Sequence, residues 1–247
     1  MLLNETEQRL AANRIRNLYP DDGPLRRELY SKHLEFFAAG ATYQERCFMA
    51  ANRVGKTIVG AYETTVHLTG EYPPWWKGRR FDQPVAWWAA GDTGETTRDI
   101  VQFELMGPIE HPGLGMIPQG NIIVATRRAG VTGAIDQVVV RHKSGGESTL
   151  GFKSYDQGRK KFQGTKKHGI WMDEEPPEDV YDECMLRLMT TSGLMICTFT
   201  PLLGLTKIAL RYLPNLALKS TEPIPLTSVP IEIRASESTK GPWSTRR

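Results

Sequence analysis

The feature that most constrains this sequence is a short apolar run, "CFMAA", that leads directly into Gly55-Lys56-Thr57. After this tripeptide, apolar residues recur at helical spacing as far as Gly70. A strand, a tight turn and a helix in this order gather backbone N–H groups and the positive end of a helix around one point, which favours phosphate. The usual first glycine of such a loop is Ala50 here, and the tripeptide alone also fits a plain helix start after a turn. The segment therefore predicts a nucleotide site that a second motif must support.

The residues of this loop have distinct expected roles. Lys56 is expected to reach the β- and γ-phosphates of a nucleotide, and the Thr57 hydroxyl to coordinate Mg²⁺. Gly55 is expected because a side chain there would collide with the phosphates. The pattern leaves open whether Arg53 points at phosphate or packs outward. ATP and Mg²⁺ are the expected ligands of a loop formed by Ala51, Asn52, Arg53, Val54, Gly55, Lys56 and Thr57.

The second motif is "GIWMDEE", an apolar run that ends in acidic residues. Asp173 is expected to hold the Mg²⁺ shell, and Glu174 to act as the general base that accepts a proton from the attacking water or orients it. The alternative is that these acids only favour the N-terminus of the helix that Pro176-Pro177 opens. The two motifs occur in the order typical of ATPases, and together they predict an ATP site.

Apolar runs alternate with helical patterns along the rest of the chain. Strands are expected in "PVAWWAA", "AIDQVVVRH", "ESTLGF" and "LMICTFTP", with a hairpin closed around Ser144-Gly145-Gly146. Helices are expected to begin near Pro24, at Asp92 as an N-cap, after Pro176-Pro177 and in "LTKIALRYL". This alternation predicts an α/β fold with a mostly parallel central sheet flanked by helices. With the loop and the acids, it indicates a P-loop NTPase of the ASCE or RecA-like type with an added β-hairpin.

The length of 247 residues suits one large domain with a short appendage. We expect an ATPase domain over residues 1–213, with a helical lead-in over 1–40. A linker or poorly ordered tail is expected over 214–247, where prolines are frequent and periodicity fades. The formal net charge of +3 permits contact with nucleic acid without requiring it.

Cys47, Cys184 and Cys197 stand far apart in apolar runs, which predicts buried thiols rather than disulfides or a zinc site. The N-terminus carries acidic residues and no long apolar run, so no signal peptide is expected. No segment approaches the roughly 18 consecutive apolar residues of a membrane span. We therefore expect an intracellular protein without a membrane partner.

Four segments together resemble one family. "ANRVGKT", "TTRDIVQFELMGP", "SYDQGRKKFQGTKKHGIWMDEEPP" and "MICTFTPLLG" are similar to the ATPase half of bacteriophage terminase large subunits, over about residues 25–213. Members of that family accept a loop of the form x-N-x-x-G-K-[ST], which agrees with Ala50. The resemblance implies an ATP-hydrolysing motor that drives double-stranded DNA into a procapsid. It also implies self-association into a ring, the portal protein and the terminase small subunit as partners, and the host cell cytoplasm as location.

The resemblance carries residue roles with it. Lys56 and Thr57 match the family's loop lysine and magnesium-binding hydroxyl, and Asp173 and Glu174 its Walker B pair. "CTFTP" matches the coupling motif, in which Thr198 or Thr200 would sense the γ-phosphate; we favour Thr200, which lies nearer the end of the strand.

The basic segment 158–168, "GRKKFQGTKKH", has three interpretations. It fits an exposed charged loop, since surface charge clusters are common. Arg159 could act as an arginine finger toward a neighbouring subunit. The lysines could instead contact the DNA backbone independently of sequence.

Aromatic residues suggest three further hypotheses. Trp87-Trp88 lies in a buried-strand pattern and is expected in the core. Trp75-Trp76 lies in a basic loop, where stacking on single-stranded bases stays open. Tyr30 or Phe36 could pack on the adenine, with core packing as the alternative.

The resemblance stops before the nuclease half that such subunits usually carry. That half needs several carboxylates for two metals, whereas after Pro201 the chain has no aspartate and only Glu222, Glu232 and Glu237. No nuclease activity is therefore expected. An isolated domain, a truncated product and a subunit completed by another chain stay open. The alternative functions are a helicase-like motor and a non-catalytic assembly module.

Overall fold

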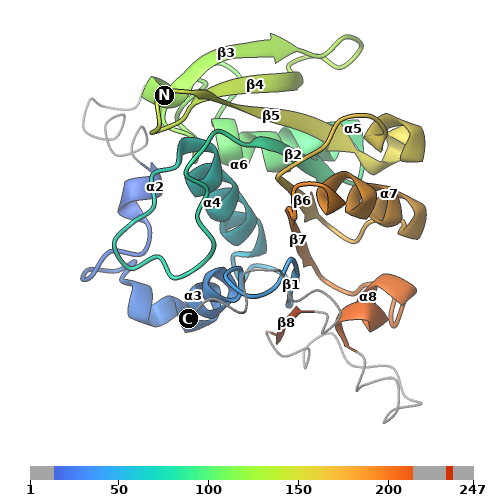
Figure 1. Cartoon of the computed structure of the whole chain (residues 1–247), viewed down its shortest axis with the longest axis horizontal. Helices are drawn as coiled ribbons and strands as arrows, with labels where there is room; N and C mark the ends of the chain where they lie inside the picture. The colour runs from blue at the N-terminus through green and yellow to red at the C-terminus, as the bar shows by residue number, and fades with distance from the viewer. Residues whose placement is uncertain (1–13, 214–231, 236–247) are drawn as a thin grey trace.

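The structure, a computed structural model, describes residues 14–213 and 232–235 (Figure 1). In this part of the chain the strands form one sheet in the order β3-β4-β5-β2-β6-β7-β1-β8. The five strands from β5 to β1 in this order run parallel, while β3, β4 and β8 are antiparallel to their neighbours. The predicted mostly parallel sheet with an added hairpin is confirmed. The strands are β1 (Glu45–Met49), β2 (Ala86–Gly91), β3 (Ile122–Arg127), β4 (Ile135–Arg141), β5 (Glu147–Ser154), β6 (Gly169–Asp173), β7 (Leu194–Phe199) and β8 (Glu232–Ala235).

Helices cover both faces of the sheet. Apolar side chains of α3, α4 and α6 belong to one core cluster, and those of α7 and α8 belong to a second. Successive residues of a strand point to opposite faces of the sheet and so alternate between the two core clusters: Trp87 lies in the first cluster and Trp88 in the second. Both indoles are buried, as predicted. The helices are α2 (Arg14–Asn17), η1 (Arg27–Tyr30), α3 (Ser31–Ala39), α4 (Lys56–Thr69), α5 (Gly94–Thr96), η2 (Thr97–Gln102), α6 (Phe103–Met106), η3 (Gln119–Asn121), η4 (Tyr155–Gln157), η5 (Arg159–Phe162), α7 (Glu178–Met189) and α8 (Lys207–Tyr212).

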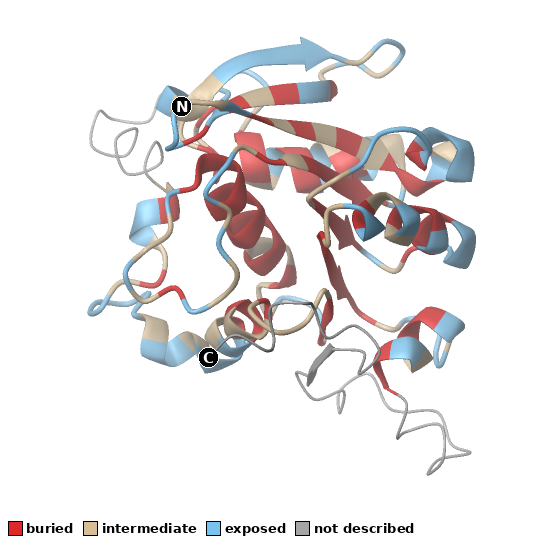
Figure 2. Cartoon of the chain, in the orientation of Figure 1, coloured by how far each residue is buried: buried red, intermediate tan, exposed pale blue. Residues whose placement is uncertain are grey.

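Helix α4 follows the loop and is buried along almost its whole length (Figure 2). It begins at Lys56 and ends at Thr69, and the positive φ of 69° at Gly70 supplies the left-handed C-terminal cap that glycine favours. The helix predicted from the sequence is therefore confirmed at both ends. Its burial against the sheet, with α6 beside it, fixes the position of the loop that precedes it.

Several expected boundaries were wrong. The helix expected from Asp92 is capped by Thr93 instead, whose side chain and that of Thr96 form a reciprocal capping box. The helix expected from Pro24 starts later, as η1 and then α3. Strand β3 was not expected, because nearly all of its residues are exposed and no buried alternation marks it.

The two ends of the chain lie mostly outside the described residues. Of the helical lead-in expected over 1–40, residues 1–13 lie outside the described part, and the rest contains α2, η1 and α3. Within the expected tail, the structure places β8 antiparallel to β1, which the sequence did not predict. The predicted domain boundary after residue 213 stays a prediction.

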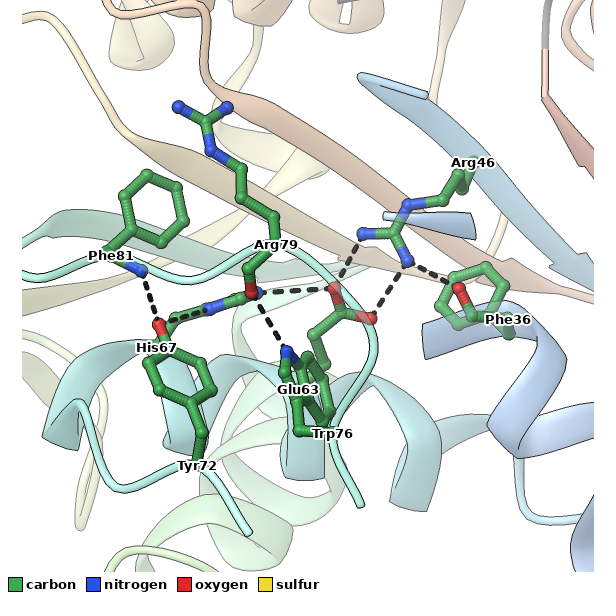
Figure 3. A network of polar contacts seen from close by, with 8 residues as sticks. All are labelled: Phe36, Arg46, Glu63, His67, Tyr72, Trp76, Arg79 and Phe81. Carbon is green, nitrogen blue, oxygen red and sulfur yellow. Dashed lines mark hydrogen bonds and ion pairs between the residues drawn. The ribbon is translucent and has the colours of Figure 1, made fainter. Parts of the chain in front are cut away.

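A buried ion pair joins the strand before the loop to the helix after it (Figure 3). Arg46 of β1 donates hydrogen bonds to both carboxylate oxygens of Glu63 in α4, at 2.6 and 3.0 Å, and another to the carbonyl oxygen of Phe36. His67, one turn later in α4, lies 3.2 Å from the same carboxylate. The pair is fully buried, so it ties the two flanks of the loop together across the core.

The three cysteine thiols are free and buried, as predicted. Among residues 14–213 and 232–235, no helix combines the length and the apolar character that a membrane crossing requires.

Candidate nucleotide site

The loop between β1 and α4 turns sharply, because two of its residues adopt left-handed backbone conformations. Arg53 has φ 65° and Gly55 has φ 84°. Successive N–H groups in such a turn converge and make an anion-binding concavity. A Cβ at Gly55 would also lie only 2.9 Å from the His33 ring. Even without a nucleotide, position 55 therefore requires glycine, both because of its positive φ and because His33 leaves no room for a side chain.

Lys56 connects the loop to the end of β7. Its ammonium group donates to the carbonyl oxygen of Ala51 at 2.9 Å and to the Thr200 hydroxyl at 2.8 Å. Only 8% of Lys56 is exposed. Burial lowers the pKa of Lys56, and the nearby Glu174 and Asp173 oppose this shift. The lysine thus lies at the same point as the two acids, as the sequence predicted.

Asp173, at the end of β6, faces the first turn of α4. The Thr57 hydroxyl lies 3.3 and 3.4 Å from the two oxygens of its carboxylate. Burial raises the pKa of Asp173 to about 7, although hydrogen bonds from Thr198 and Thr57 oppose the shift. Strand order explains the meeting, because β6, β7 and β1 are parallel neighbours whose carboxyl ends share one edge of the sheet.

Thr198 and Thr200 have separate partners, although both belong to the predicted coupling motif. The Thr198 hydroxyl donates to Asp173 at 2.7 Å and accepts from the Trp171 indole N–H at 2.7 Å. Thr200 accepts from Lys56, and its hydroxyl lies 2.9 Å from the carbonyl oxygen of Ala50 and 3.0 Å from Asn52 Oδ1. Thr198 therefore orients the acid, while Thr200 contacts the lysine and the loop.

Trp171 was not expected to serve the site. Its indole lies where a Cβ on Gly60 of α4 would be, so only glycine leaves room for it. From that position the indole reaches Thr198, which in turn reaches Asp173. The sequence pattern marks Trp171 only as an apolar core residue and carries no signal of this contact.

Glu174 follows Asp173 in an unusual conformation. Its φ of 70° is left-handed, which costs a non-glycine residue of order 1–3 kcal/mol. Two residues hold this turn: Glu174 N–H donates to the carbonyl oxygen of Thr198 at 3.0 Å, and the Tyr155 hydroxyl contacts the carbonyl oxygens of Asp173 and Glu174 at 3.2 and 3.0 Å. Burial raises the pKa of Glu174, with Lys56 opposing, and its side chain is exposed enough to meet a substrate.

We expect Tyr155→Phe to lower kcat for ATP hydrolysis by roughly tenfold. The change leaves the ring in place and removes the donor to two backbone carbonyls, a loss of about 1–1.5 kcal/mol, which is roughly a factor of ten in rate. Because neither carbonyl touches substrate, KM for ATP should change little. Tyr181→Phe removes a hydroxyl that is equally buried but donates to Glu45 at 2.7 Å, and it should leave kcat unchanged. A wild-type kcat for Tyr155→Phe would show that Glu174 does not depend on this bond.

A histidine supports the loop from behind, and no sequence motif selects it. His33 of α3 lies 3.1 Å from the carbonyl oxygen of Val54 through Nε2 and 2.9 Å from the Tyr19 hydroxyl through Nδ1. Burial lowers the pKa of His33, which favours the neutral ring. Tyr19 then donates to Nδ1, and Nε2–H donates to the loop.

Other predicted residues lie as follows. Arg159 of η5 donates to Glu183 of α7 at 2.9 Å, so its guanidinium already has a partner within the chain, and a finger role stays a prediction. Arg53 is exposed, and its target stays open.

The aromatic hypotheses have clearer outcomes. Phe36 is fully buried against Phe48, so it does not face a nucleotide. Trp76 is buried and cannot stack on a base, whereas Trp75 is half-buried and stacks on Tyr62 with ring centroids 6.0 Å apart, so a role of Trp75 in binding bases stays a prediction. Tyr30 is half-buried beside His33.

Comparison with known proteins identifies this architecture. The family described as "Terminase large subunit, T4likevirus-type, N-terminal" matches residues 47–239. The large terminase subunit of Salmonella phage P22 is 40% identical over an alignment of 206 residues, and the match covers 75% of this chain and 41% of that protein. The chain therefore spans about two fifths of the length of that relative.

Two solved structures are similar. The large terminase of a thermophilic bacteriophage, in complex with ADP, matches with a TM-score of 0.51 at 17% identity, over 78% of this chain and 43% of that one. The HK97 bacteriophage large terminase matches with a TM-score of 0.41 at 13% identity, over 81% and 33%. The first likeness supports the predicted P-loop fold class. The chain belongs to the terminase large subunits, in the N-terminal family of the T4-like type.

Proposed function

We propose that this chain is the ATP-hydrolysing motor domain of a phage terminase large subunit, which drives double-stranded DNA into a procapsid. Family membership supports the class of machine. One observation carries the chemistry: the Thr57 hydroxyl of α4 lies 3.3 Å from the Asp173 carboxylate at the end of β6, beside the buried Lys56. A hydroxyl, a carboxylate and an ammonium at one loop are the groups that a magnesium–nucleotide complex requires.

The donor set fits Mg²⁺. This ion takes oxygen ligands, keeps several waters and is usually held by one or two protein groups together with substrate phosphates. The Thr57 hydroxyl and the Asp173 carboxylate supply such oxygens at one point. A nearby divalent cation would favour the ionised form of Asp173, whose pKa burial raises to about 7. When bound with the nucleotide, Mg²⁺ would neutralise charge on the β- and γ-phosphate oxygens.

The protein groups then have these tasks. The N–H groups of the loop and of the first turn of α4 bind the phosphates, and Lys56 turns from Ala51 toward the β- and γ-phosphates. Glu174 accepts a proton from the water that attacks the γ-phosphorus. As that oxygen–phosphorus bond forms, the bond to the ADP oxygen breaks, and the exposed Glu174 then releases the proton to solvent before the next turnover. The ADP complex of the thermophilic phage's large terminase agrees with a nucleotide at this fold.

In this proposal Thr200 couples this step to movement. Its hydroxyl contacts Lys56, the Ala50 carbonyl oxygen and the Asn52 side chain. When Lys56 leaves Thr200 for a phosphate, Thr200 loses one of these partners. The contacts between the end of β7 and the loop would therefore differ with and without a bound γ-phosphate. A residue that senses the γ-phosphate must make such a difference.

The remaining parts of the proposal come from the resemblance. A ring of copies at the portal vertex, with the portal protein and the small subunit as partners, would work in the host cell cytoplasm. Arg159 of one copy would reach the γ-phosphate of its neighbour, which requires that it leave Glu183.

The test is ATP turnover as a function of protein concentration, with Mg²⁺ and with or without duplex DNA. We expect hydrolysis that rises more steeply than protein concentration, because neighbouring copies complete each site, and that duplex DNA stimulates. Lys56→Ala is the matched control and should be inactive throughout. Folded wild-type protein without any magnesium-dependent turnover would contradict the proposal, and a constant specific activity would contradict shared sites.

A further inference from the structure

Two lysines, one in β5 and one just before β6, meet over one buried indole. The ammonium group of Lys153, in β5, lies 5.5 Å from the centre of the Trp88 ring, and that of Lys167, just before β6, lies 4.7 Å from it. Trp88 is only 5% exposed and packs edge-on against Phe162 of η5. The ammonium groups are therefore held by cation–π contacts over an aromatic ring that is itself fixed in the core.

Further positive charge lies close by. Burial lowers the pKa of Lys153, and Arg128 and Lys161 lower it further while Asp136 opposes them. Burial also lowers the pKa of Lys167, and Lys153 adds to that shift. Among the described residues, no ion pair joins Lys153 or Lys167 to a carboxylate. We call Arg128, Lys153, Lys161 and Lys167 the cationic cluster.

The cluster borders an open part of the sheet. Trp88 pairs in register with Gly151 of β5, which pairs with Gln137 of β4, so these residues point to the same face. Val138 and Leu150, which alternate with them, are buried on the opposite face under α4. At the outer edge, β3 is exposed along nearly its whole length (Figure 2). An extended partner can therefore lie against this surface.

We infer that the cationic cluster binds backbone phosphates of duplex DNA. This inference rests on the proposed function, to which it adds the contact surface. Like charges that outnumber their acidic neighbour, Asp136, are unfavourable alone and become favourable against a polyanion. The indole is too deeply buried to stack on a base, so the cluster contacts phosphate and does not distinguish sequence. A motor that moves along any duplex requires a contact of this kind.

The position of the cluster also connects it to the nucleotide site. Lys153 lies two residues before Tyr155, whose hydroxyl contacts the carbonyl oxygens of Asp173 and Glu174. Lys161 lies in η5, which follows Tyr155 after one short turn. A phosphate bound at Lys153 would therefore lie close along the chain to the tyrosine that contacts the backbone of both acids.

The test measures binding of a fluorescently labelled duplex of arbitrary sequence by anisotropy over a series of salt concentrations. Each lost phosphate contact reduces the slope of log K against log salt by about 0.9. We expect Lys153→Gln/Lys167→Gln to reduce the slope by about 2 and to weaken binding at low salt. ATP turnover without DNA should equal that of the wild type, since neither lysine contacts the nucleotide loop.

A matched variant removes the same charge elsewhere. Lys77→Gln/Lys143→Gln changes two exposed lysines outside the cluster and should keep the wild-type slope. A wild-type slope in the cluster variant, or an equal loss in the matched variant, would overturn the inference. So would a change confined to self-association, measured by sedimentation, because the cluster would then contact another copy of the chain. Each of these three results leaves the proposed function standing as long as the wild type hydrolyses ATP. If the wild type does not hydrolyse ATP, the proposed function is wrong, whatever the salt dependence of DNA binding.

Discussion

Glu174→Gln is expected to reduce ATP turnover by about 10²- to 10⁴-fold and to leave ATP binding nearly unchanged. The glutamine side chain has the size of the glutamate side chain. The left-handed backbone of residue 174 is unchanged, because the Tyr155 hydroxyl and the carbonyl oxygen of Thr198 hold it. The glutamine amide cannot accept the proton of the attacking water. Phosphate binding depends on Lys56 and the loop, which the change does not touch. Steady-state hydrolysis and titration with a fluorescent ATP analogue measure the two effects separately.

The adjacent acid supplies the control. Glu175 is half-buried, and its carboxylate accepts a hydrogen bond from Thr206 at the start of α8. Glu175→Gln therefore makes the same chemical change one residue away, and its turnover should stay within a few-fold of the wild type. Equal losses in both variants would show that net charge at this edge matters and not a base at Glu174. A wild-type rate in Glu174→Gln would assign the proton to another group.

Part of this site follows from the sequence because it is built from strand ends. A phosphate loop after β1 and acids after β6 must lie at the same edge once both strands belong to one parallel sheet. Lys56, Thr57 and Asp173 could therefore be predicted before their distances were known. The same reasoning works for any residue at the carboxyl end of a parallel strand. The direction of the strand, and not its place in the strand order, decides at which edge of the sheet the residue lies.

Other residues depend on the order of strands, which the sequence does not contain. Tyr155 follows β5, and β2 separates β5 from β6, so only the assembled sheet brings its hydroxyl to Glu174. Thr198 in β7 and Thr200 just after its end stand two residues apart and look equivalent in the sequence. Trp171 and Lys56, which come from other elements, give them different tasks. His33 is similar, since its role follows from how α3 packs behind the loop.

Strand β3 and the wrongly expected helix starts have a simpler cause. Exposed strands carry no alternation of buried and polar residues, and β3 exists because β4 offers it a partner. At Asp92 and Thr93 two adjacent residues can both cap a helix, and the capping box with Thr96 decides for the second. Such local competition is settled by the two reciprocal hydrogen bonds of the capping box.

The second large effect concerns stability. Glu63→Gln is expected to lower the free energy of unfolding by about 3–5 kcal/mol, because it leaves the fully buried Arg46 without a compensating charge. Burial alone would raise the pKa of Glu63, but Arg46 and His67 outweigh it, and the pKa is lowered. Urea denaturation at neutral pH measures the loss. Glu35→Gln removes the acid of an exposed pair with Lys32 and should cost less than about 1 kcal/mol.

The pH dependence of this loss distinguishes charge from shape. Because folding lowers the pKa of Glu63, its contribution to stability is present above the pKa of an unfolded glutamate and is lost as pH falls through the folded value. The difference between wild type and Glu63→Gln should therefore be constant near neutrality and narrow in acid. A difference that is the same at every pH would assign the loss to the geometry of the amide. Arg46 and Glu63 flank the phosphate loop on β1 and α4. Because Glu63→Gln weakens the contact between these two elements, it should also weaken the binding of ATP by the loop.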